Sequence, residues 1–356
     1  MQLRRGYKQT DAGIIPTEWD AVPLSKLIIE FRGGAPLKPS DFTSTGIKVL
    51  PKGGVGRTGW LEIEDHELQF CSQNYATSHR SNQVDQNFTI VVLRDLVPSG
   101  PSIGLIVQIK EDETYVLAQG VYGFRVNQSV EPRYLVHLSN TYWYRQLMKS
   151  IMVGSTQVHV TNAAFKSLII PLPSPREQLA IAGALGDVDA LIEELDRLIA
   201  KKRYLKQAAM QQLLTGRTRL LGFSGEWDDL LVNDVIVNSF CGPSPTCEER
   251  NIADEFEWGV LKTTAATVDG GWNWRAHKVL PRAFWHQHHI ALRKGDLIVT
   301  KAGPRHRVGV AVWIDFVPPR VIPSGKMIAL RPDPKRAVPL LLAAAISAPA
   351  AQTFLD

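Results

Sequence analysis

Residues 154–216 read GSTQVHVTNAAFKSLIIPLPSPREQLAIAGALGDVDALIEELDRLIAKKRYLKQAAMQQLLTG, and this stretch contains the longest helix signal in the chain. Ser174 suits the N-cap, Pro175 suits the first helical position, and Glu177 suits the acidic position of a capping box. The final glycine of the stretch is a suitable helix stop. The pattern predicts one helix over residues 175–215, which would be roughly 60 Å long at about 1.5 Å per residue.

An apolar stripe with a spacing of about 3.5 residues runs along this predicted helix. Its members are Ile181, Leu185, Val188, Ile192, Leu195 and Ile199. Beyond Ile199 the next seam positions hold Lys202 and Lys206, and Leu205 belongs to a shifted line, as after a stutter. Such a repeat is typical of coiled coils and predicts that a second helix covers this face. The alternative is an ordinary amphipathic helix on the surface of a domain.

The chain also resembles itself at a separation of roughly 205 to 212 residues. The matching pairs, in the same order in both halves, are Glu18–Asp20 with Glu226–Asp228, Gly59 and Trp60 with Gly271 and Trp272, Ile90–Val92 with Ile298–Thr300, Gly120 with Gly325, and Leu135 with Leu340. These collinear matches indicate a duplicated domain. Short apolar runs broken by Gly, Pro, Asn and Ser predict strands, and residues 134–151 are predicted to form a helix.

The predicted fold is therefore α+β, with two similar mixed α/β domains joined by one long coiled-coil-type helix. We expect a first domain over residues 1–153, a linker with the helix over 154–216, and a second domain over 217–356. In the second copy Asp356 corresponds roughly to Ile151, so we expect the chain to stop where a second linker and helix would begin. A second copy of the chain would then supply the missing helix, by self-association through the stripe.

Composition sets broad limits on function. With 356 residues, 44% hydrophobic and 21% charged, the chain is long enough for two or three globular domains. The 40 Lys and Arg residues exceed the 35 Asp and Glu residues, and the net charge of +5 is compatible with nucleic acid as a partner.

The N-terminus lacks the apolar stretch of a signal peptide, and the most apolar segment, 339–351, is too short to span a bilayer. We expect a cytoplasmic protein with no membrane partner. Three cysteines argue against a disulfide framework.

Several local sequences resemble the specificity (S) subunit of Type I restriction-modification enzymes, in order and spacing over nearly the whole chain. They are GIIPTEW at 13–19, GSTQ at 154–157, PLP at 171–173, EQ at 177–178, QLLTG at 212–216 and KGDLI at 294–298. The resemblance implies a non-catalytic adaptor with two target recognition domains, each of which reads one half of a split site in double-stranded DNA. It also implies that helical regions set the distance between the domains.

Partners and cofactors follow from the same resemblance. Methyltransferase (M) subunits are expected to dock on the helical regions, and restriction (R) subunits are expected to join through them. S-adenosylmethionine is expected on the methyltransferase subunit, and no cofactor is expected on this chain. The family normally has two antiparallel helices, whereas we expect only one in this sequence, without the C-terminal conserved helix.

Candidate DNA contacts lie on predicted loops rich in cations, amides and hydroxyls. Arg and Lys suit guanine, Asn and Gln suit adenine, and phosphates accept hydrogen bonds from all of these and from Ser and Thr. The candidates in the first domain are Lys52, Arg57, Thr58, Trp60, Arg80, Asn82, Gln83, Arg94 and Ser102. Those in the second domain are Lys262, Thr263, Asn273, Arg275, Lys301, Gly303, Arg305, His306 and Arg307. For each residue the alternative is an ordinary solvated surface side chain.

The alternatives to DNA recognition are a DNA-modifying enzyme and a truncated subunit that serves only as a self-associating scaffold. The Gly-rich loop at 53–59 lacks the Gly-Lys-Ser/Thr ending of a P-loop, and the pair Pro318-Pro319 lacks the flanks of an adenine methyltransferase motif. Adjacent histidines at 286–289 would point to opposite faces of a strand, which disfavours a metal site. The sequence therefore predicts neither catalytic residues nor a metal.

Overall fold

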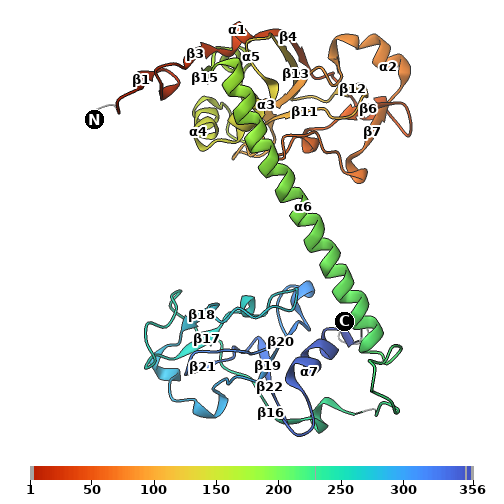
Figure 1. Cartoon of the computed structure of the whole chain (residues 1–356), viewed down its shortest axis with the longest axis vertical. Helices are drawn as coiled ribbons and strands as arrows, with labels where there is room; N and C mark the ends of the chain where they lie inside the picture. The colour runs from red at the N-terminus through yellow and green to blue at the C-terminus, as the bar shows by residue number, and fades with distance from the viewer. Residues whose placement is uncertain (1–3, 229, 349–350, 354–356) are drawn as a thin grey trace. The chain divides into compact units, whose positions relative to one another are not determined.

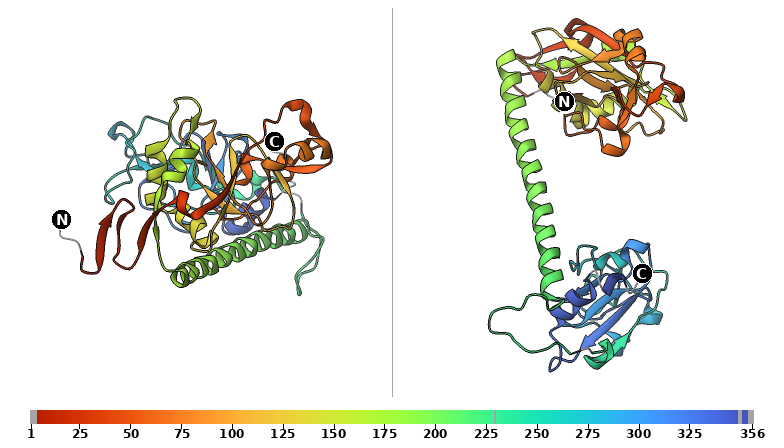
Figure 2. Two further views of the ribbon diagram at one scale, coloured as in Figure 1. Left: turned by 90° about the horizontal axis from the view of Figure 1, so that it is seen from above. Right: turned by 90° about the vertical axis from the view of Figure 1, so that its right-hand side faces the viewer.

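The computed structural model describes residues 4–228, 230–348 and 351–353 (Figure 1). It is an α+β fold in which two β-rich domains are joined by one long helix, as predicted. Figure 2 shows this helix from two further directions as one uninterrupted element. Parts of the predicted second domain, residues 229, 349–350 and 354–356, lie outside the described residues.

The joining helix, α6 (Pro175–Leu213), has 39 residues. The chain divides into two compact units, unit 1 (Met1–Asp196) and unit 2 (Arg197–Asp356), and the division falls inside α6. Within the described residues, no helix combines the length and the apolar character that crossing a bilayer requires.

Unit 1 is built on two sheets that pack face to face. The antiparallel four-stranded sheet has the order β11 (Ile106–Gln108), β9 (Thr89–Val92), β13 (Val121–Val126), β4 (Ile28–Gly33). The second sheet has the order β5 (Phe42–Thr43), β7 (Gln69–Cys71), β6 (Ile47–Leu50), β12 (Tyr115–Leu117), β8 (Gln83–Val84), with β6 and β12 parallel. Side chains alternate along β9, so Ile90 and Val92 join the core between the sheets and Val91 joins the core under the helices.

Most helices of unit 1 cover the other face of the four-stranded sheet, whereas residues 73–78 pack against the second sheet. The helices of unit 1 before α6 are α1 (Leu24–Leu27), α2 (Gln73–Ser78), α3 (Pro132–Asn140), α4 (Tyr142–Ile151) and α5 (Asn162–Ser167). The strand pairs are β1 (Tyr7–Thr10) with β2 (Gly13–Pro16), β3 (Asp20–Pro23) with β15 (Ile169–Leu172), and β10 (Arg94–Asp95) with β14 (Val158–His159). The single helix predicted over 134–151 is wrong, because Thr141 is extended and its hydroxyl accepts a hydrogen bond from the Tyr144 N–H as the N-cap of a new helix.

Within the described residues, unit 2 repeats the central topology of both sheets with seven strands. Its antiparallel sheet has the order β16 (Ile236–Phe240), β22 (Met327–Pro332), β19 (Leu297–Thr300), β20 (Ala311–Trp313), which matches β4, β13, β9, β11. Its second sheet has the order β18 (His277–Val279), β17 (Gly259–Leu261), β21 (Val321–Ile322), which matches β7, β6, β12, including the parallel pair. One helix, α7 (Pro339–Ile346), takes the place of α3, and both begin with proline.

The strand registers confirm the repeat and correct one aligned pair. Val121 lies opposite Val92, and Met327 lies opposite Thr300, the residue that matches Val92 in the repeat. Gly120 therefore corresponds to Lys326 and not to Gly325.

The ends of α6 follow the predicted chemistry in part. The hydroxyl of Ser174 accepts the N–H of Glu177 at 3.3 Å. The carboxylate of Glu177 accepts the indole N–H of Trp19 at 3.0 Å, which is a tertiary contact and not the second half of the predicted capping box. The helix ends at Leu213, two residues before the predicted end, and Gly216 takes a φ of +69° beyond it. This left-handed conformation is the usual reason for glycine at a helix stop.

One buried side chain, that of Gln178, fastens the start of α6 to unit 1. Its exposed fraction is 0%. The amide oxygen accepts the backbone N–H of Glu131 at 2.7 Å, and the amide nitrogen donates to the carbonyls of Ser129 at 3.0 Å and Pro173 at 2.8 Å. One amide thus joins the loop before α3, the segment before α6 and α6 itself.

We expect Gln178→Ala to lower the free energy of unfolding by about 2–3 kcal/mol, because it leaves buried backbone groups unpaired. Urea unfolding measures the change. Gln207→Ala is the matched control, since Gln207 is an exposed glutamine of the same helix and its loss should change stability by less than about 0.5 kcal/mol. Equal effects of the two substitutions would contradict the proposed role of the amide.

Candidate nucleic-acid interface

Two of the predicted DNA contacts, Lys52 and Ser102, bind a buried carboxylate. The side chain of Asp95 is 3% exposed, and the Lys52 ammonium lies 3.1 Å from it. The hydroxyl and the backbone N–H of Ser102 donate to Asp95 at 2.6 and 3.2 Å, and the N–H of Val97 donates at 3.3 Å. Asp95 therefore ties the loop after β10 to the loop that begins at Lys52.

This hydrogen bonding controls the ionisation of Asp95. Burial by itself would raise its pKa, but hydrogen bonds from Ser102 and Lys52 outweigh burial and lower the pKa to about 2. The unfolded carboxyl titrates near the ordinary value of 3.8. The charged form therefore stabilises the fold fully above about pH 4, and this contribution is lost as the pH falls through the folded pKa.

We expect Asp95→Asn to lower the free energy of unfolding by about 2 kcal/mol at pH 7, in line with a pKa shift of nearly two units. The difference from the unsubstituted protein should shrink between about pH 4 and pH 2. Urea unfolding at pH 7, 4 and 2.5 measures both effects. A deficit of the same size at all three values would show that the charge of Asp95 is not the cause.

The Gly-rich loop of unit 1 presents its tip to solvent and anchors its end. Arg57 and Thr58 are exposed. Trp60 is half-buried, with the Lys110 ammonium 6.0 Å and the Arg133 guanidinium carbon 5.3 Å from its ring centre. These cation–π contacts occupy the ring. Arg57 and Thr58 are therefore the accessible candidates for DNA contact in this loop.

The predicted donor run at 78–83 turns two of its amides inward. The Asn82 amide donates to the Gly33 carbonyl at 2.8 Å, and the Gln83 amide donates to the Ala76 carbonyl. Arg80 is exposed. Of these three candidates, only Arg80 presents its polar group to solvent.

Arg94 is exposed at the start of β10, and its guanidinium donates to the amide oxygen of Gln157 at 2.9 Å. Gln157 is not among the sequence candidates for DNA contact. It is the last residue of the GSTQ motif, which is one of the sequences that carry the family resemblance.

Lys262 and Thr263 of unit 2 serve the loop structure through different atoms. The Lys262 ammonium lies 3.2 Å from the carboxylate of Glu249, which also binds Lys278. Hydrogen bonds from Lys278 and Lys262 lower the pKa of Glu249. The carbonyl of Thr263 accepts a hydrogen bond from Arg307. The positive charge of Lys262 is therefore partly neutralised within the unit.

Asn273 and Arg275 form an exposed turn beside two aromatic rings. The Asn273 side-chain oxygen accepts the Arg275 N–H at 3.2 Å, and the Arg275 guanidinium carbon lies 5.0 Å from the ring centre of Trp274. Trp274 contacts Phe316 edge to face at 5.3 Å. The Arg275 guanidinium is thereby held at the surface of unit 2.

The loop after β19 divides its cations between structure and surface. Arg307 points inward and donates to the carbonyls of Thr263 and Ala266, each at 2.8 Å. The Lys301 ammonium lies 3.4 Å from the sulfur of Cys241. Lys301, Gly303, Arg305 and His306 all lie in the exposed part of the loop, and Gly303 has a φ of +142°.

The accessible candidates therefore form a subset of the predicted set in each unit. They are Arg57, Thr58, Arg80 and Arg94 in unit 1, and Asn273, Arg275, Lys301, Gly303, Arg305 and His306 in unit 2. The described residues contain no group of three or more His, Cys, Asp and Glu side chains that could hold a metal ion. Two of the histidines at 286–289, His286 and His288, pack against the ring of Trp258.

The apolar stripe of α6 is exposed along most of its length. The exposed fractions are 44% for Leu185, 52% for Val188, 52% for Ile192, 48% for Leu195, 47% for Ile199 and 50% for Leu205. Ile181 packs against the core of unit 1. A contiguous row of half-exposed aliphatic side chains is unusual on a soluble surface and is typical of an interface.

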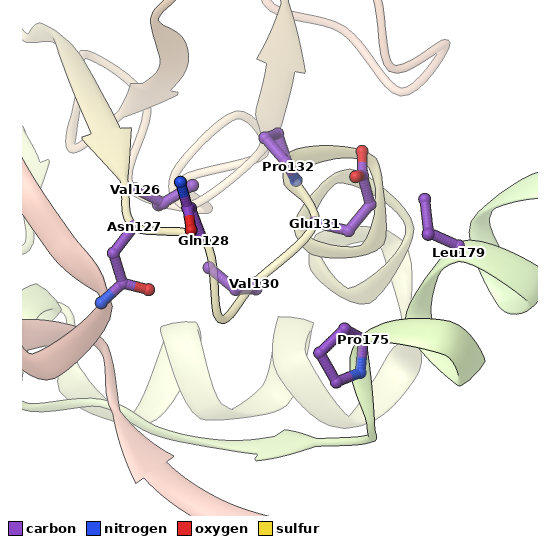
Figure 3. Close-up of a pocket in the computed structure, with 8 residues that line it drawn as sticks. All are labelled: Val126, Asn127, Gln128, Val130, Glu131, Pro132, Pro175 and Leu179. Carbon is purple, nitrogen blue, oxygen red and sulfur yellow. The ribbon is translucent and has the colours of Figure 1, made fainter.

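A shallow hollow lies beside the first turn of α6, lined by Val126, Asn127, Gln128, Val130, Glu131, Pro132, Pro175 and Leu179 (Figure 3). Its described lining includes the carboxylate of Glu131 and no cationic side chain. It is therefore poorly suited to a phosphate.

Comparison with known proteins agrees with this architecture. Residues 40–201 match the protein-family model for the Type I restriction modification DNA specificity domain. The matched segment runs from the first loops of unit 1 into α6. Residues 40–201 therefore form a specificity domain of the Type I restriction-modification family.

Specificity subunits of known systems match parts of the chain. The MjaVIII specificity subunit of Methanocaldococcus jannaschii is 24% identical over 217 residues, which cover 61% of this chain and 50% of that protein. The EcoEI specificity subunit of Escherichia coli is 32% identical over 102 residues, which cover 29% of this chain and 17% of that protein. The chain thus matches half or less of the length of these relatives.

A solved structure, that of the Type I restriction-modification S subunit from M. genitalium, has the same fold. It is 14% identical, with a TM-score of 0.57, and the match covers 100% of this chain and 80% of that one.

Proposed function

We propose that this chain is a specificity subunit that reads a bipartite target in double-stranded DNA, one half-site with each unit. The observation that carries the proposal is the repeat of the central sheet topology of unit 1 in unit 2 across one helix. Two copies of one fold can each present the same set of loops to a half-site, and a stiff helix of about 58 Å between them leaves a spacer unread. Residues 1–153 and 217–356 would be the reading domains, and 154–216 the spacer.

The accessible loop residues would make the DNA contacts. Arg57, Arg80 and Arg275 suit guanine or phosphate, and Asn273 suits adenine. The segment 301–306 combines cationic side chains with a glycine, which has no side chain to block access to the backbone. The other predicted contacts would position these loops. They are Lys52, Asn82, Gln83, Ser102, Lys262, Thr263, Trp60 and Arg307.

Catalysis would belong to other chains. Methyltransferase subunits would dock on the helical region and bind S-adenosylmethionine, and restriction subunits would join through them. A DNA target places this work in the cytoplasm. Calorimetric titration of the isolated chain with S-adenosylmethionine should therefore give no binding heat.

We further propose that the stripe of α6 pairs with α6 of a second copy in antiparallel orientation. The charge along the helix changes from negative to positive at its centre. The acidic half contains Asp187, Asp189, Glu193, Glu194 and Asp196, and the basic half contains Arg197, Lys201, Lys202, Arg203 and Lys206. An antiparallel partner sets each acidic half against a basic half. The helix dipole acts only over the end turns, so it gives no reason for charges placed at the centre.

Co-purification with a methyltransferase subunit, followed by DNA binding at two salt concentrations and mapping of the methylated adenines, tests the function. We expect two modified half-sites at a constant spacing, and affinity that falls steeply as salt rises. A complex that forms but shows no salt-dependent DNA binding would identify the chain as a scaffold and contradict the proposal.

A further inference from the structure

A second hollow in unit 1 lies where β10 pairs with β14. It is lined by Leu93, Arg94, Tyr122, Gln157, His159, Val160, Thr161 and Asn162. Its described lining includes a guanidinium, two amides, a hydroxyl, a phenol and an imidazole, and no carboxylate. The composition suits an anion, in contrast to the hollow beside α6, which includes Glu131 (Figure 3).

The cation of this hollow, Arg94, is held at both ends of its side chain. Its guanidinium donates to the Gln157 amide oxygen at 2.9 Å. Its Cβ lies against Gly120, which has a φ of +90°, and a side chain at that glycine would come within 3.0 Å of it. The next residue, Asp95, fixes the loop that follows.

The Gln157 side is equally constrained. Val153 and His159 exchange backbone hydrogen bonds at 3.0 and 2.9 Å, which closes a hairpin whose exposed tip is 154–157. Gly154 has a φ of +111°, and a Cβ there would lie 2.1 Å from the Gln157 carbonyl oxygen. Only glycine fits this position. Because the hollow is already ordered, a ligand that binds there causes little loss of conformational entropy.

The hydrogen-bond pattern distinguishes a phosphate from a base edge. Bidentate recognition of adenine needs both the oxygen and the nitrogen of a glutamine amide, and the Gln157 oxygen already accepts from Arg94. The Thr161 hydroxyl oxygen accepts the Ala164 N–H at 3.1 Å, so its proton remains for a ligand. The groups left to a ligand are mainly N–H and O–H donors. A phosphodiester, which only accepts hydrogen bonds, matches such a rim.

We propose that this hollow binds one phosphate of the DNA backbone, with Arg94 as the charged contact and Gln157 as the residue that positions it. The proposal rests on the proposed function, since it places a sequence-independent contact within unit 1. It assigns to the GSTQ hairpin a part in DNA affinity and none in the choice of target.

The test measures DNA affinity of the methyltransferase complex against salt concentration, for the target duplex and for a scrambled duplex. We expect Arg94→Gln to weaken binding to both duplexes by the same factor, about 3- to 10-fold, and to reduce the slope of log K against log salt by about 0.9, the value for one phosphate. Gln157→Glu keeps an acceptor for Arg94 and adds a negative charge that repels phosphate. It should therefore weaken binding to both duplexes more than Arg94→Gln does. Lys149→Gln removes an exposed cation of α4 in the same unit and should leave the slope unchanged.

Each other outcome overturns the proposal. An unchanged slope for Arg94→Gln, with an unchanged melting temperature, would show that no phosphate binds there. A loss confined to the target duplex would identify Arg94 as a base contact. If the unsubstituted complex binds neither duplex, the proposed function itself fails, which is a different result from either of these.

Discussion

Insertion of one heptad into α6 between Ala200 and Lys201 is expected to abolish binding to the original target and to create a target with a longer spacer. Residues 187–207 of the helix are exposed, so the insertion disturbs no core, and seven residues preserve the phase of the stripe. The helix lengthens by about 10 Å, which corresponds to about three base pairs. One half-site of the original DNA is then out of reach, and affinity should fall by about 10³-fold or more.

Methylation mapping on random-spacer duplexes measures this result, since the modified adenines should lie about three base pairs further apart. The matched control replaces residues 194–200 with the inserted heptad at unchanged length and should keep the original spacing. If the lengthened chain retains the original target, the helix does not set the distance between the half-sites.

Reversal of the basic half of α6, by Lys201→Glu, Lys202→Glu and Arg203→Glu together, is expected to convert a self-associating chain to monomer. In the antiparallel pair these side chains would face the acidic half of the partner, so the substitution replaces attraction by repulsion along the whole seam. All three are exposed, and the free energy of unfolding of the single chain should change by less than about 1 kcal/mol. Light scattering across a concentration series measures the mass.

A compensating variant separates this pairing from a general effect of charge. This variant adds Asp187→Lys, Glu194→Lys and Asp196→Lys to the three substitutions in the basic half. Opposite charges then face each other again in an antiparallel pair, so the dimer should return. A parallel pair would place equal halves side by side, and neither variant would then behave as expected. A monomer for the unsubstituted chain at high concentration would exclude self-association through α6.

Local and periodic features of this protein were readable from its sequence. The helix α6 starts at Pro175 because of its cap and stops near Gly216 because of a helix breaker. The strand repeat at Ile90 and Ile298 is visible in residue spacing. Each of these features acts over a few residues. The break between α3 and α4 was missed, because the apolar content of the segment continues across Thr141.

The same limit applies to the candidate DNA-contact residues. Sequence reasoning located the loops but not the direction of their side chains. Asn82 and Arg307 have the chemistry of base readers, yet each donates to backbone carbonyls within its own unit. No sequence pattern marks Asp95, although it orders Lys52 and Ser102.

The sequence by itself determined the duplicated fold, the long helix and its apolar stripe, because each arises from a pattern that neighbouring residues impose on one another. Only the tertiary structure decided which polar side chains remain available to DNA. A buried carbonyl or carboxylate must be paired, and its partner comes from whichever loop the fold brings near, often many residues away in the chain.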